Sequence, residues 1–338
     1  MSCSSMFTTT DMRPFFKWVL YILFGILLVV VFILFVARMT SYSREVRVGR
    51  DSAPSTGKFV HAADVDMFYQ EWGPKDGQAV IFLHAAGGWS EVWKETGKAL
   101  GGEGYHVIAL DMPPLGYSQR PDDALYSRED QAKRIVGVMN ALRIDKAVLV
   151  GHSFGGRAVA QVALQYPRRV KALVLVDAAL SFKKPGEHAS LLMRIVLALG
   201  PVRNAFAAAT VTNPAFTHSL IKMFVANPAS ATDYWVSVYQ TPLSLKGTTK
   251  AVGDWLPQLL AEEDSSLSSA SAAYKNIQVP TLIVWGSEDH TTPLADGKYL
   301  ASIIPGVQLS VMPGLGHLPP IEDTVGFDDV LLRFLKQM

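Results

Sequence analysis

Short apolar runs alternate with amphipathic stretches along most of the chain after residue 58. The runs have the length and the β-branched content of strands that are buried on both faces of a sheet. They cover residues 79–84, 106–111, 146–152, 171–177 and 280–286, with a weaker run at 307–312. The stretches between them, such as 127–142, place apolar residues at helical spacing, and residues 59–72 resemble a hairpin with its turn near 63–66. This alternation predicts an α/β fold with a mostly parallel sheet and helices on both faces.

The alternation stops between the fourth and fifth of these runs. The intervening stretch has mostly helical character, and only three charged residues lie between positions 189 and 232, namely Arg194, Arg203 and Lys222. We therefore expect a helical cap, at about residues 180–275, inserted between two strands of the sheet. Its large apolar residues include Leu191, Leu192, Met193, Phe206, Phe216, Met223 and Phe224.

One long apolar segment lies near the N-terminus, at residues 18–37 (WVLYILFGILLVVVFILFVA). At about 1.5 Å per residue, a helix of this length spans a hydrocarbon core of about 30 Å. The alternatives are a cleaved signal peptide and a buried core helix. A signal peptide has an apolar run of about 7–15 residues, and the sequence around Ala37 is a poor cleavage site. We predict an uncleaved transmembrane helix, with Trp18 and Tyr21 as interfacial anchors.

The transmembrane helix divides the chain into a tail (residues 1–17), the span (18–37), a polar linker (38–57) and a catalytic domain (58–338). Basic residues favour the cytoplasmic side of a membrane. Two precede the span and four follow it closely: Arg13, Lys17, Arg38, Arg44, Arg47 and Arg50. This small excess favours a cytoplasmic catalytic domain.

Composition excludes several other classes of function. A net charge of +1 provides no field for nucleic acid, and no predicted helix carries a stripe of Lys and Arg. Cys3 is the single cysteine, so an internal disulfide and a cysteine-based metal site are both impossible. Acylation of Cys3 is an alternative to an inert thiol, although no lipidation motif surrounds it.

The most informative motif is Gly151-His152-Ser153-Phe154-Gly155, which follows a predicted strand and opens a predicted helix. Gly-x-Ser-x-Gly in this setting is a nucleophile elbow. A sharp turn from strand to helix strains the serine backbone and brings Gly151 and Gly155 too close for side chains. The turn presents the Ser153 hydroxyl at the strand ends as a candidate nucleophile.

A serine hydroxyl needs a base, and a histidine base needs an acid to orient it. His317 lies in a glycine-containing loop after the last predicted strand, and it is the candidate base. Asp289, directly after the strand at 280–286, is the candidate acid, and Glu288 is its alternative. The chain order Ser153, Asp289, His317 is that of α/β-hydrolases.

The negative oxygen formed during attack needs backbone donors already aimed at it. We expect one from Phe154, directly after the nucleophile, and one from Ala86 in the small-residue loop at 84–88. No metal or organic cofactor is implied by this chemistry.

Five landmarks in order, FLHAAGG, ALDMPPLGYS, LVGHSFGG, PTLIVWGSEDHTTP and MPGLGHLPP, make the chain resemble the α/β-hydrolase family from about residue 58 to the C-terminus. Two positions depart from the family pattern. Ala85 stands where members often have glycine, and Pro114 stands where an Asp-x-Pro-Gly loop is common. Ala85 is small enough for the expected oxyanion site, whereas Pro114 weakens any inference about substrate from its loop.

The resemblance, with serine as nucleophile, implies acyl transfer to water. Epoxide hydrolases and haloalkane dehalogenases of this fold use a carboxylate instead. The apolar cap and the membrane span favour an esterase or lipase acting on lipophilic acyl esters, and by analogy the architecture resembles monoacylglycerol-lipase-like hydrolases. Alternatives are a C–C bond hydrolase, a perhydrolase and a non-catalytic membrane-tethered binding module. The scarcity of acids in the cap disfavours a peptidase.

Overall fold

A mostly parallel, eight-stranded sheet forms the centre of the computed structural model, which describes residues 12–180, 191–260 and 266–338. Its strand order is β1-β2-β4-β3-β5-β6-β7-β8. Strand β2 runs antiparallel to β1 and β4, and the other neighbours are parallel. The strands are β1 (Gly57–Ala62), β2 (Val65–Trp72), β3 (Ala79–Leu83), β4 (His106–Leu110), β5 (Ala147–His152), β6 (Val170–Val176), β7 (Thr281–Gly286) and β8 (Gln308–Met312). The predicted α/β fold is confirmed.

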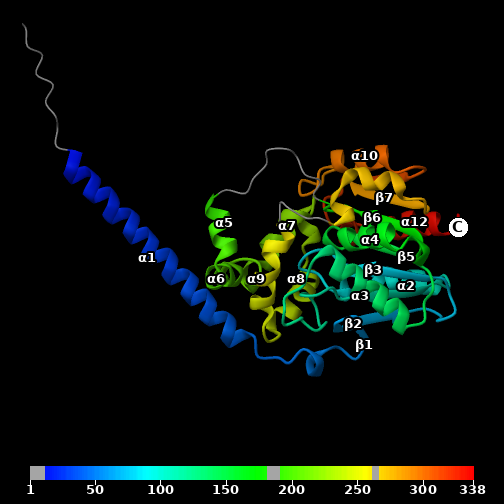
Figure 1. Cartoon of the computed structure of the whole chain (residues 1–338), viewed down its shortest axis with the longest axis horizontal. Helices are drawn as coiled ribbons and strands as arrows, with labels where there is room; N and C mark the ends of the chain where they lie inside the picture. Colours follow the sequence, from blue (N-terminus) through cyan, green and yellow to red (C-terminus); the bar gives the residue numbers. More distant parts are fainter. Residues whose placement is uncertain (1–11, 181–190, 261–265) are drawn as a thin grey trace, which may run out of the picture.

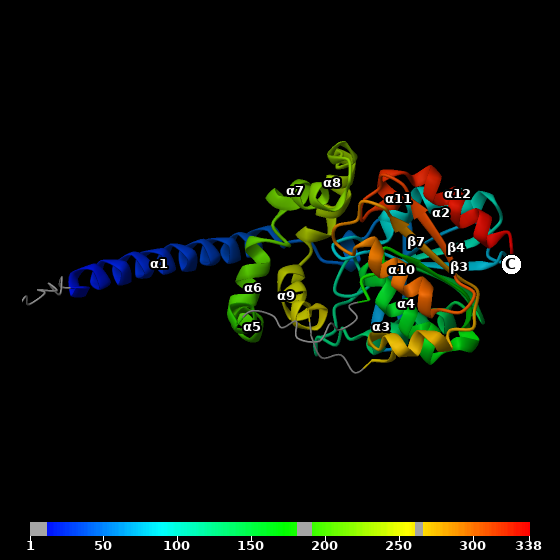
Figure 2. The same cartoon turned by 90° about the horizontal axis from the view of Figure 1, so that it is seen from above.

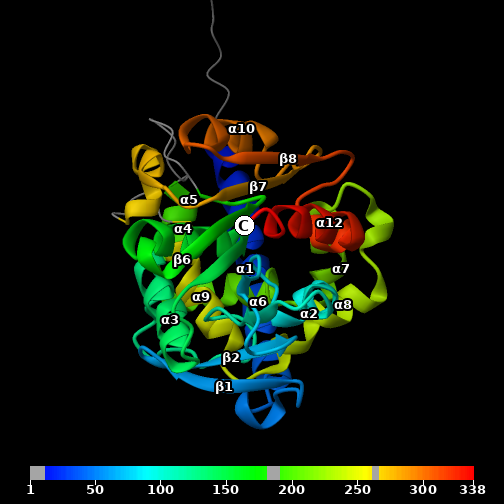
Figure 3. The same ribbon diagram turned by 90° about the vertical axis from the view of Figure 1, so that its right-hand side faces the viewer.

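Helices cover both faces of this sheet (Figure 3). In β3, Ile81 and Leu83 pack in the layer that contains α3, α4 and α10, whereas Val80 and Phe82 pack in the layer that contains α2 and α12. Both sets of side chains are buried, which explains why the strand sequences are unbroken apolar runs. The helices are α2 (Lys94–Gly102), α3 (Arg128–Ala141), α4 (Phe154–Gln165), α10 (Leu294–Ile303), α11 (Pro319–Glu322) and α12 (Thr324–Leu335).

A helical insertion between β6 and β7 forms the predicted cap (Figure 1). Its helices are α5 (Leu191–Ala198), α6 (Gly200–Ala209), α7 (Pro214–Phe224), α8 (Asp233–Gln240) and α9 (Thr248–Leu259). Residues 181–190 and 261–265 of the predicted cap lie outside the described part of the chain. The cap lies beyond the carboxyl ends of the parallel strands, where α/β folds bind ligands.

Helix α1 (Met12–Arg44) projects away from the domain (Figures 1 and 2). Its most apolar window has a mean hydropathy of 3.3 and no buried residues, so the alternative of a buried core helix does not hold. The helix continues past the predicted end at residue 37 to Arg44. No proline or glycine interrupts it there, and the Arg38 guanidinium donates to Ser41 (3.1 Å) and Tyr42 (2.8 Å) in the next turn.

The predicted linker, residues 38–57, is not a free tether. Its first residues are helical, and the following segment is attached to the cap. The Arg47 N–H donates to the Ser244 carbonyl oxygen (3.1 Å), and Glu45 Oε1 accepts from the Thr249 N–H (3.1 Å). Helix α1 also packs against α6. Apolar spacing could not reveal these contacts, because the partners lie about two hundred residues away.

Candidate active site

The turn from β5 into α4 places Ser153 in a strained conformation, with φ 50° and ψ −112°. A Cβ atom on Gly151 would lie 2.6 Å from the Gly155 carbonyl oxygen, and one on Gly155 would lie 2.7 Å from the Leu83 carbonyl oxygen. Since backbone atoms cannot move aside cheaply, both positions require glycine. The local geometry is that of the expected nucleophile elbow.

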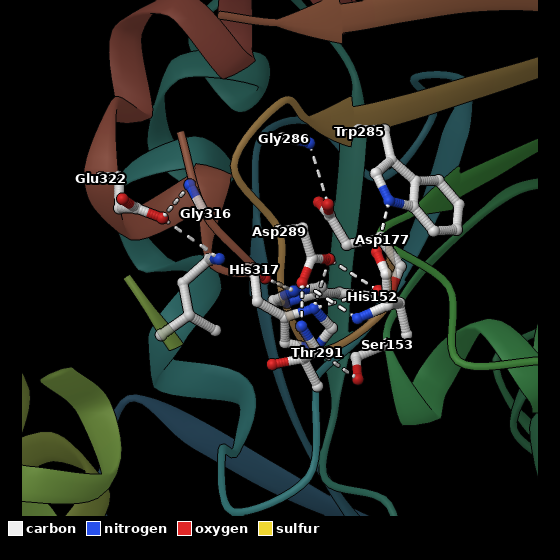
Figure 4. Close-up of polar contacts among 12 residues, drawn as sticks. His152, Ser153, Asp177, Trp285, Gly286, Asp289, Thr291, Gly316, His317 and Glu322 are labelled. Atoms are coloured by element: carbon white, nitrogen blue, oxygen red, sulfur yellow. Dashed lines mark hydrogen bonds and ion pairs between the residues drawn. The ribbon is translucent and has the colours of Figure 1, made fainter. Parts of the chain in front are cut away.

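The structure brings the three predicted side chains together, as Figure 4 shows. His317 Nε2 lies 2.8 Å from Ser153 Oγ, and His317 Nδ1 lies 2.7 Å from Asp289 Oδ2. A carboxylate can only accept, so Nδ1 carries the proton and the Nε2 lone pair accepts from the Ser153 hydroxyl. All three residues are buried. The imidazole is therefore held in the tautomer that a general base requires.

The Asp289 carboxylate is held by several donors. Its Oδ1 accepts from the N–H groups of Thr291 (2.7 Å) and Thr292 (3.0 Å), and the Thr292 hydroxyl donates to Oδ2 (2.6 Å). Burial alone would raise the pKa of Asp289, but His317 and the Thr292 donors outweigh it and lower the pKa. The alternative acid, Glu288, is exposed and accepts a hydrogen bond from Ser287.

Ala86 and Phe154, the two expected oxyanion donors, line the same cavity as Ser153. Within the described part of the chain, neither backbone N–H donates a hydrogen bond, so both are available to a ligand. The adjacent His84 supports this loop, because its Nδ1–H donates to the Ala85 carbonyl oxygen (2.8 Å) and its Nε2 accepts from the Met112 N–H (2.9 Å). Burial lowers the pKa of His84 to about 4, so its ring is neutral.

The site opens into a cavity of about 1420 Å³ between the sheet and the cap. Most lining side chains are apolar. Those from the cap include Met193, Leu197, Leu220, Ile221, Phe224, Val252, Trp255 and Leu256. Such a lining suits a hydrocarbon portion of a ligand.

The α/β-hydrolase fold model matches residues 78–324, which contain the sheet core, the cap and all of these side chains. The chain belongs to the α/β-hydrolase fold family. It is 29% identical to 2-hydroxymuconate semialdehyde hydrolase of Pseudomonas sp. (strain CF600), over 85% of this chain and 96% of that protein. Such relatives support a hydrolase activity acting on a small molecule.

Two solved structures extend the comparison. A meta-cleavage product hydrolase from Pseudomonas fluorescens IP01 has a TM-score of 0.69 and 28% identity, covering 83% of this chain and 98% of that chain. A membrane phospholipase A, described as a bacterial virulence factor, has a TM-score of 0.67 and 21% identity, covering 96% and 99%. The second likeness shows the fold alone.

Three polar residues around the candidate site were not identified from the sequence. The His152 Nε2–H donates to the His317 carbonyl oxygen (2.7 Å) and fixes the loop that carries His317. The Thr292 hydroxyl orients Asp289, as described above. Asp177, at the end of β6, is fully buried, and its Oδ1 accepts from the Gly286 N–H (2.9 Å). Only the position of Thr292, just after Asp289, was a usable signal in the sequence.

Asp177, Asp289 and His317 form the one cluster of potential metal ligands in the described residues, with ligand atoms within 4.8 Å of one another. These atoms are engaged with their neighbours. Asp289 and His317 hydrogen bond to each other, and Asp177 accepts from Gly286. A metal ion on this set would displace the imidazole proton shared with Asp289, so the donor set suits a hydrogen-bonded site better than a metal site.

Proposed function

We propose that the protein is a membrane-anchored serine hydrolase that cleaves carboxylic esters of lipophilic acyl groups. The supporting observation is the chain of hydrogen bonds from Asp289 through His317 to Ser153, at the wall of a large apolar cavity. Membership of the family supports the fold and a hydrolase activity. The geometry of this site is the reason for proposing an acyl-enzyme mechanism.

In the proposed mechanism, His317 Nε2 takes the Ser153 proton as Oγ attacks the acyl carbonyl carbon. Asp289 stabilises the resulting imidazolium, and the N–H groups of Phe154 and Ala86 hold the negative oxygen. The imidazolium then protonates the leaving alcohol, which leaves the acyl group on Ser153. A water molecule, deprotonated by His317, releases the carboxylic acid and restores the serine.

Helix α1 supports the membrane part of the proposal. From residue 34 to its end at Arg44, the partly or fully buried positions of α1 follow helical spacing on one side, and they are Leu34, Ala37, Arg38, Ser41 and Arg44. Because α1 packs on α6, the cap lies beside the C-terminal part of the apolar helix. Leu191 and Leu192 of the neighbouring α5 are 73% and 71% exposed. A lipid surface beside α5 and the C-terminal part of α1 would cover these two leucine side chains. It would also bring lipophilic substrates close to the cavity.

A fluorophosphonate probe tests the catalytic proposal directly. The wild-type protein should label, whereas Ser153→Ala should not, because the probe needs an activated serine. Asp289→Asn should label far more slowly, since the amide favours the wrong imidazole tautomer. Glu288→Gln is the matched control and should label like the wild type. Equal labelling of the wild type and Ser153→Ala would contradict the mechanism, and absence of labelling in both would favour a non-catalytic binding module.

A second candidate function is hydrolysis of a C–C bond beside a carbonyl group. The similarity to 2-hydroxymuconate semialdehyde hydrolase and to a meta-cleavage product hydrolase favours it. Turnover of p-nitrophenyl esters with increasing acyl length, compared with turnover of a ring-cleavage dienone, separates the two. Ester activity should rise with chain length, and activity confined to acetyl esters or to the dienone would overturn the proposed substrate class.

The single cysteine offers a test of the membrane proposal and of its orientation. With the catalytic domain in the cytoplasm, Cys3 lies outside and should react with a membrane-impermeant maleimide on intact cells, whereas Cys3→Ser should not. Labelling only after cell lysis would reverse the orientation. Loss of the N-terminal mass from the isolated protein would identify a cleaved signal peptide instead.

A further inference from the structure

The apolar cavity contains a cation whose charge is not neutralised by an ion pair. Three charged side chains line it: Arg120, Arg157 and Asp296. The Arg157 guanidinium is used within the protein, donating to the carbonyl oxygens of Ala179 (2.6 Å) and Leu259 (2.8 Å). Arg120 is held differently, and part of its guanidinium has no acceptor among the described residues.

Arg120 donates to two neutral acceptors. Its Nε bonds to the Pro114 carbonyl oxygen (3.2 Å), and its Nη2 bonds to Thr248 Oγ1 (2.8 Å). A guanidinium has five N–H donors, so three lack an acceptor among the described residues. Burial lowers the pKa of Arg120, which shows that its surroundings disfavour the charge. Yet arginine keeps its proton in proteins, so the charge stays.

Tyr126, Glu45 and Asp111 act electrostatically on Arg120. Burial raises the pKa of Tyr126 to about 12, so it is neutral, and the two carboxyl groups are engaged elsewhere. Glu45 Oε1 accepts from the Thr249 N–H (3.1 Å). The oxygens of Asp111 accept from the N–H groups of Ser90 and Tyr117, each at 2.7 Å. Burial raises the pKa of Asp111 to about 7, which weakens it further as a counter-ion near neutral pH. Neither acid forms an ion pair with Arg120 in the described part of the chain.

We infer that Arg120 is the anion-binding subsite of the cavity and recognises a carboxylate or phosphate on the substrate. This inference rests on the proposed function and narrows its substrate class to acyl compounds that carry an oxyanion apart from the reacting carbonyl. The fork of free N–H groups matches either oxyanion, and the loss of solvation on burial is recovered when the ligand supplies the negative charge. The apolar walls hold the hydrocarbon between the two polar ends.

Two matched substrate pairs test the inference by kinetics. The first is p-nitrophenyl octanoate against mono-p-nitrophenyl suberate, which differs by a terminal carboxylate on the acyl chain. The second is 1-lauroylglycerol against its 3-phosphate, which carries the charge on the leaving alcohol. The measured quantity is the anionic-to-neutral ratio of kcat/KM. Arg120→Gln should lower this ratio about tenfold or more for one pair. The affected pair identifies carboxylate or phosphate as the ligand, and an unchanged ratio for both overturns the inference.

A binding experiment separates this inference from the catalytic proposal. Ser153→Ala, titrated with dodecyl phosphate, dodecanoate and dodecanol, should bind one anion more tightly than the alcohol. Adding Arg120→Gln should lower the ratio of anion affinity to alcohol affinity about tenfold, whether or not the protein hydrolyses esters. Equal affinity for all three ligands, or an equal loss for all three, overturns the inference.

Two further variants distinguish anion binding from a structural contact. Arg120→Lys keeps the charge and should retain part of the anion preference, and it replaces Arg120→Gln if the glutamine variant does not fold. Thr248→Val removes the hydroxyl acceptor but keeps the guanidinium. If the only role of Arg120 is to hold its loop against α9, Thr248→Val should cause the same loss of anion preference as Arg120→Gln. That result would overturn the inference.

Discussion

Asp177→Asn should raise the stability of the protein relative to wild type by an amount that grows with pH. Asp177 is fully buried, and the charge of the Asp289 carboxylate acts on it. Burial first, and Asp289 second, raise the pKa of Asp177 well above its ordinary value. Two buried carboxyls this close cannot both ionise cheaply, and Asp289 has the better donors. The proton therefore resides on Asp177.

The substitution copies the protonated acid. Asparagine Oδ1 can accept from the Gly286 N–H as Asp177 does, and the amide NH₂ replaces the acid hydroxyl. Asparagine also tolerates the positive φ of this position (40°) better than most residues. The variant should therefore fold and keep fluorophosphonate labelling of Ser153.

The magnitude follows from linkage. A group whose pKa is raised by folding stabilises the folded state fully below its unfolded pKa, about 3.9, and loses that contribution as pH rises through its folded pKa. In this window the wild type loses about 1.4 kcal/mol per pH unit through Asp177, and the variant loses nothing. Titrating groups that do not interact with Asp177, including Asp111, occur in both proteins and cancel in the difference. The variant should therefore gain stability relative to the wild type, at up to about 1.4 kcal/mol per pH unit, as the pH rises above the unfolded pKa of Asp177.

Urea denaturation of the full chain in detergent micelles, followed by tryptophan fluorescence, measures this difference at a series of pH values. The free energy of unfolding comes from the midpoint and the slope of each transition. Parallel pH dependences for the two proteins between pH 5 and pH 7 would refute the reasoning, because they would mean that Asp177 is ionised in the folded state throughout.

Three other substitutions, one of them with a matched control, have expected outcomes. Gly155→Ala would place a methyl group 2.7 Å from a β3 carbonyl oxygen and should abolish probe labelling, whereas Gly102→Ala, with open space around it, should label normally. The Glu322 carboxylate accepts hydrogen bonds from the backbone N–H groups of Ala226 and Gly316. In Glu322→Gln, the amide NH₂ would face one of these N–H groups, so two donors would meet without an acceptor. This substitution should lower the free energy of unfolding by about 1–3 kcal/mol in urea denaturation. Arg50→Gln breaks an exposed ion pair and should change that free energy by less than about 1 kcal/mol, and a larger loss would contradict the assignment of this pair to the solvated surface.

The nucleophile elbow was predictable because its constraints are local. The strand before Ser153, the helix after it and the glycines at 151 and 155 all lie within a few residues, and the clashes that require those glycines involve that turn and the neighbouring β3. The candidate base and acid were predictable from their order, since each follows a recognisable strand. The structure then brought His317 and Asp289 into contact without any change of candidate.

The linker and the charged groups around the site were not predictable in the same way. Polar composition at 38–57 favours a flexible tether, but Arg47 and Glu45 bond to cap residues that are far along the chain. Likewise, Arg120 looks like an ordinary surface cation in a loop. Its enclosure beside the cavity depends on Thr248 and on the loop at Pro114.

The sequence by itself determined the elements whose information is periodic or local: the buried strands, the apolar N-terminal helix, the helical cap and the strained serine turn. Only the tertiary structure decided which polar groups share a low-dielectric space, because that depends on contacts between distant segments. Such contacts raise the pKa of Asp177, fix the tautomer of His317 and leave Arg120 without an ion pair in the described part of the chain. Burial therefore changes the pKa, the tautomer or the pairing of side chains that would behave ordinarily in water.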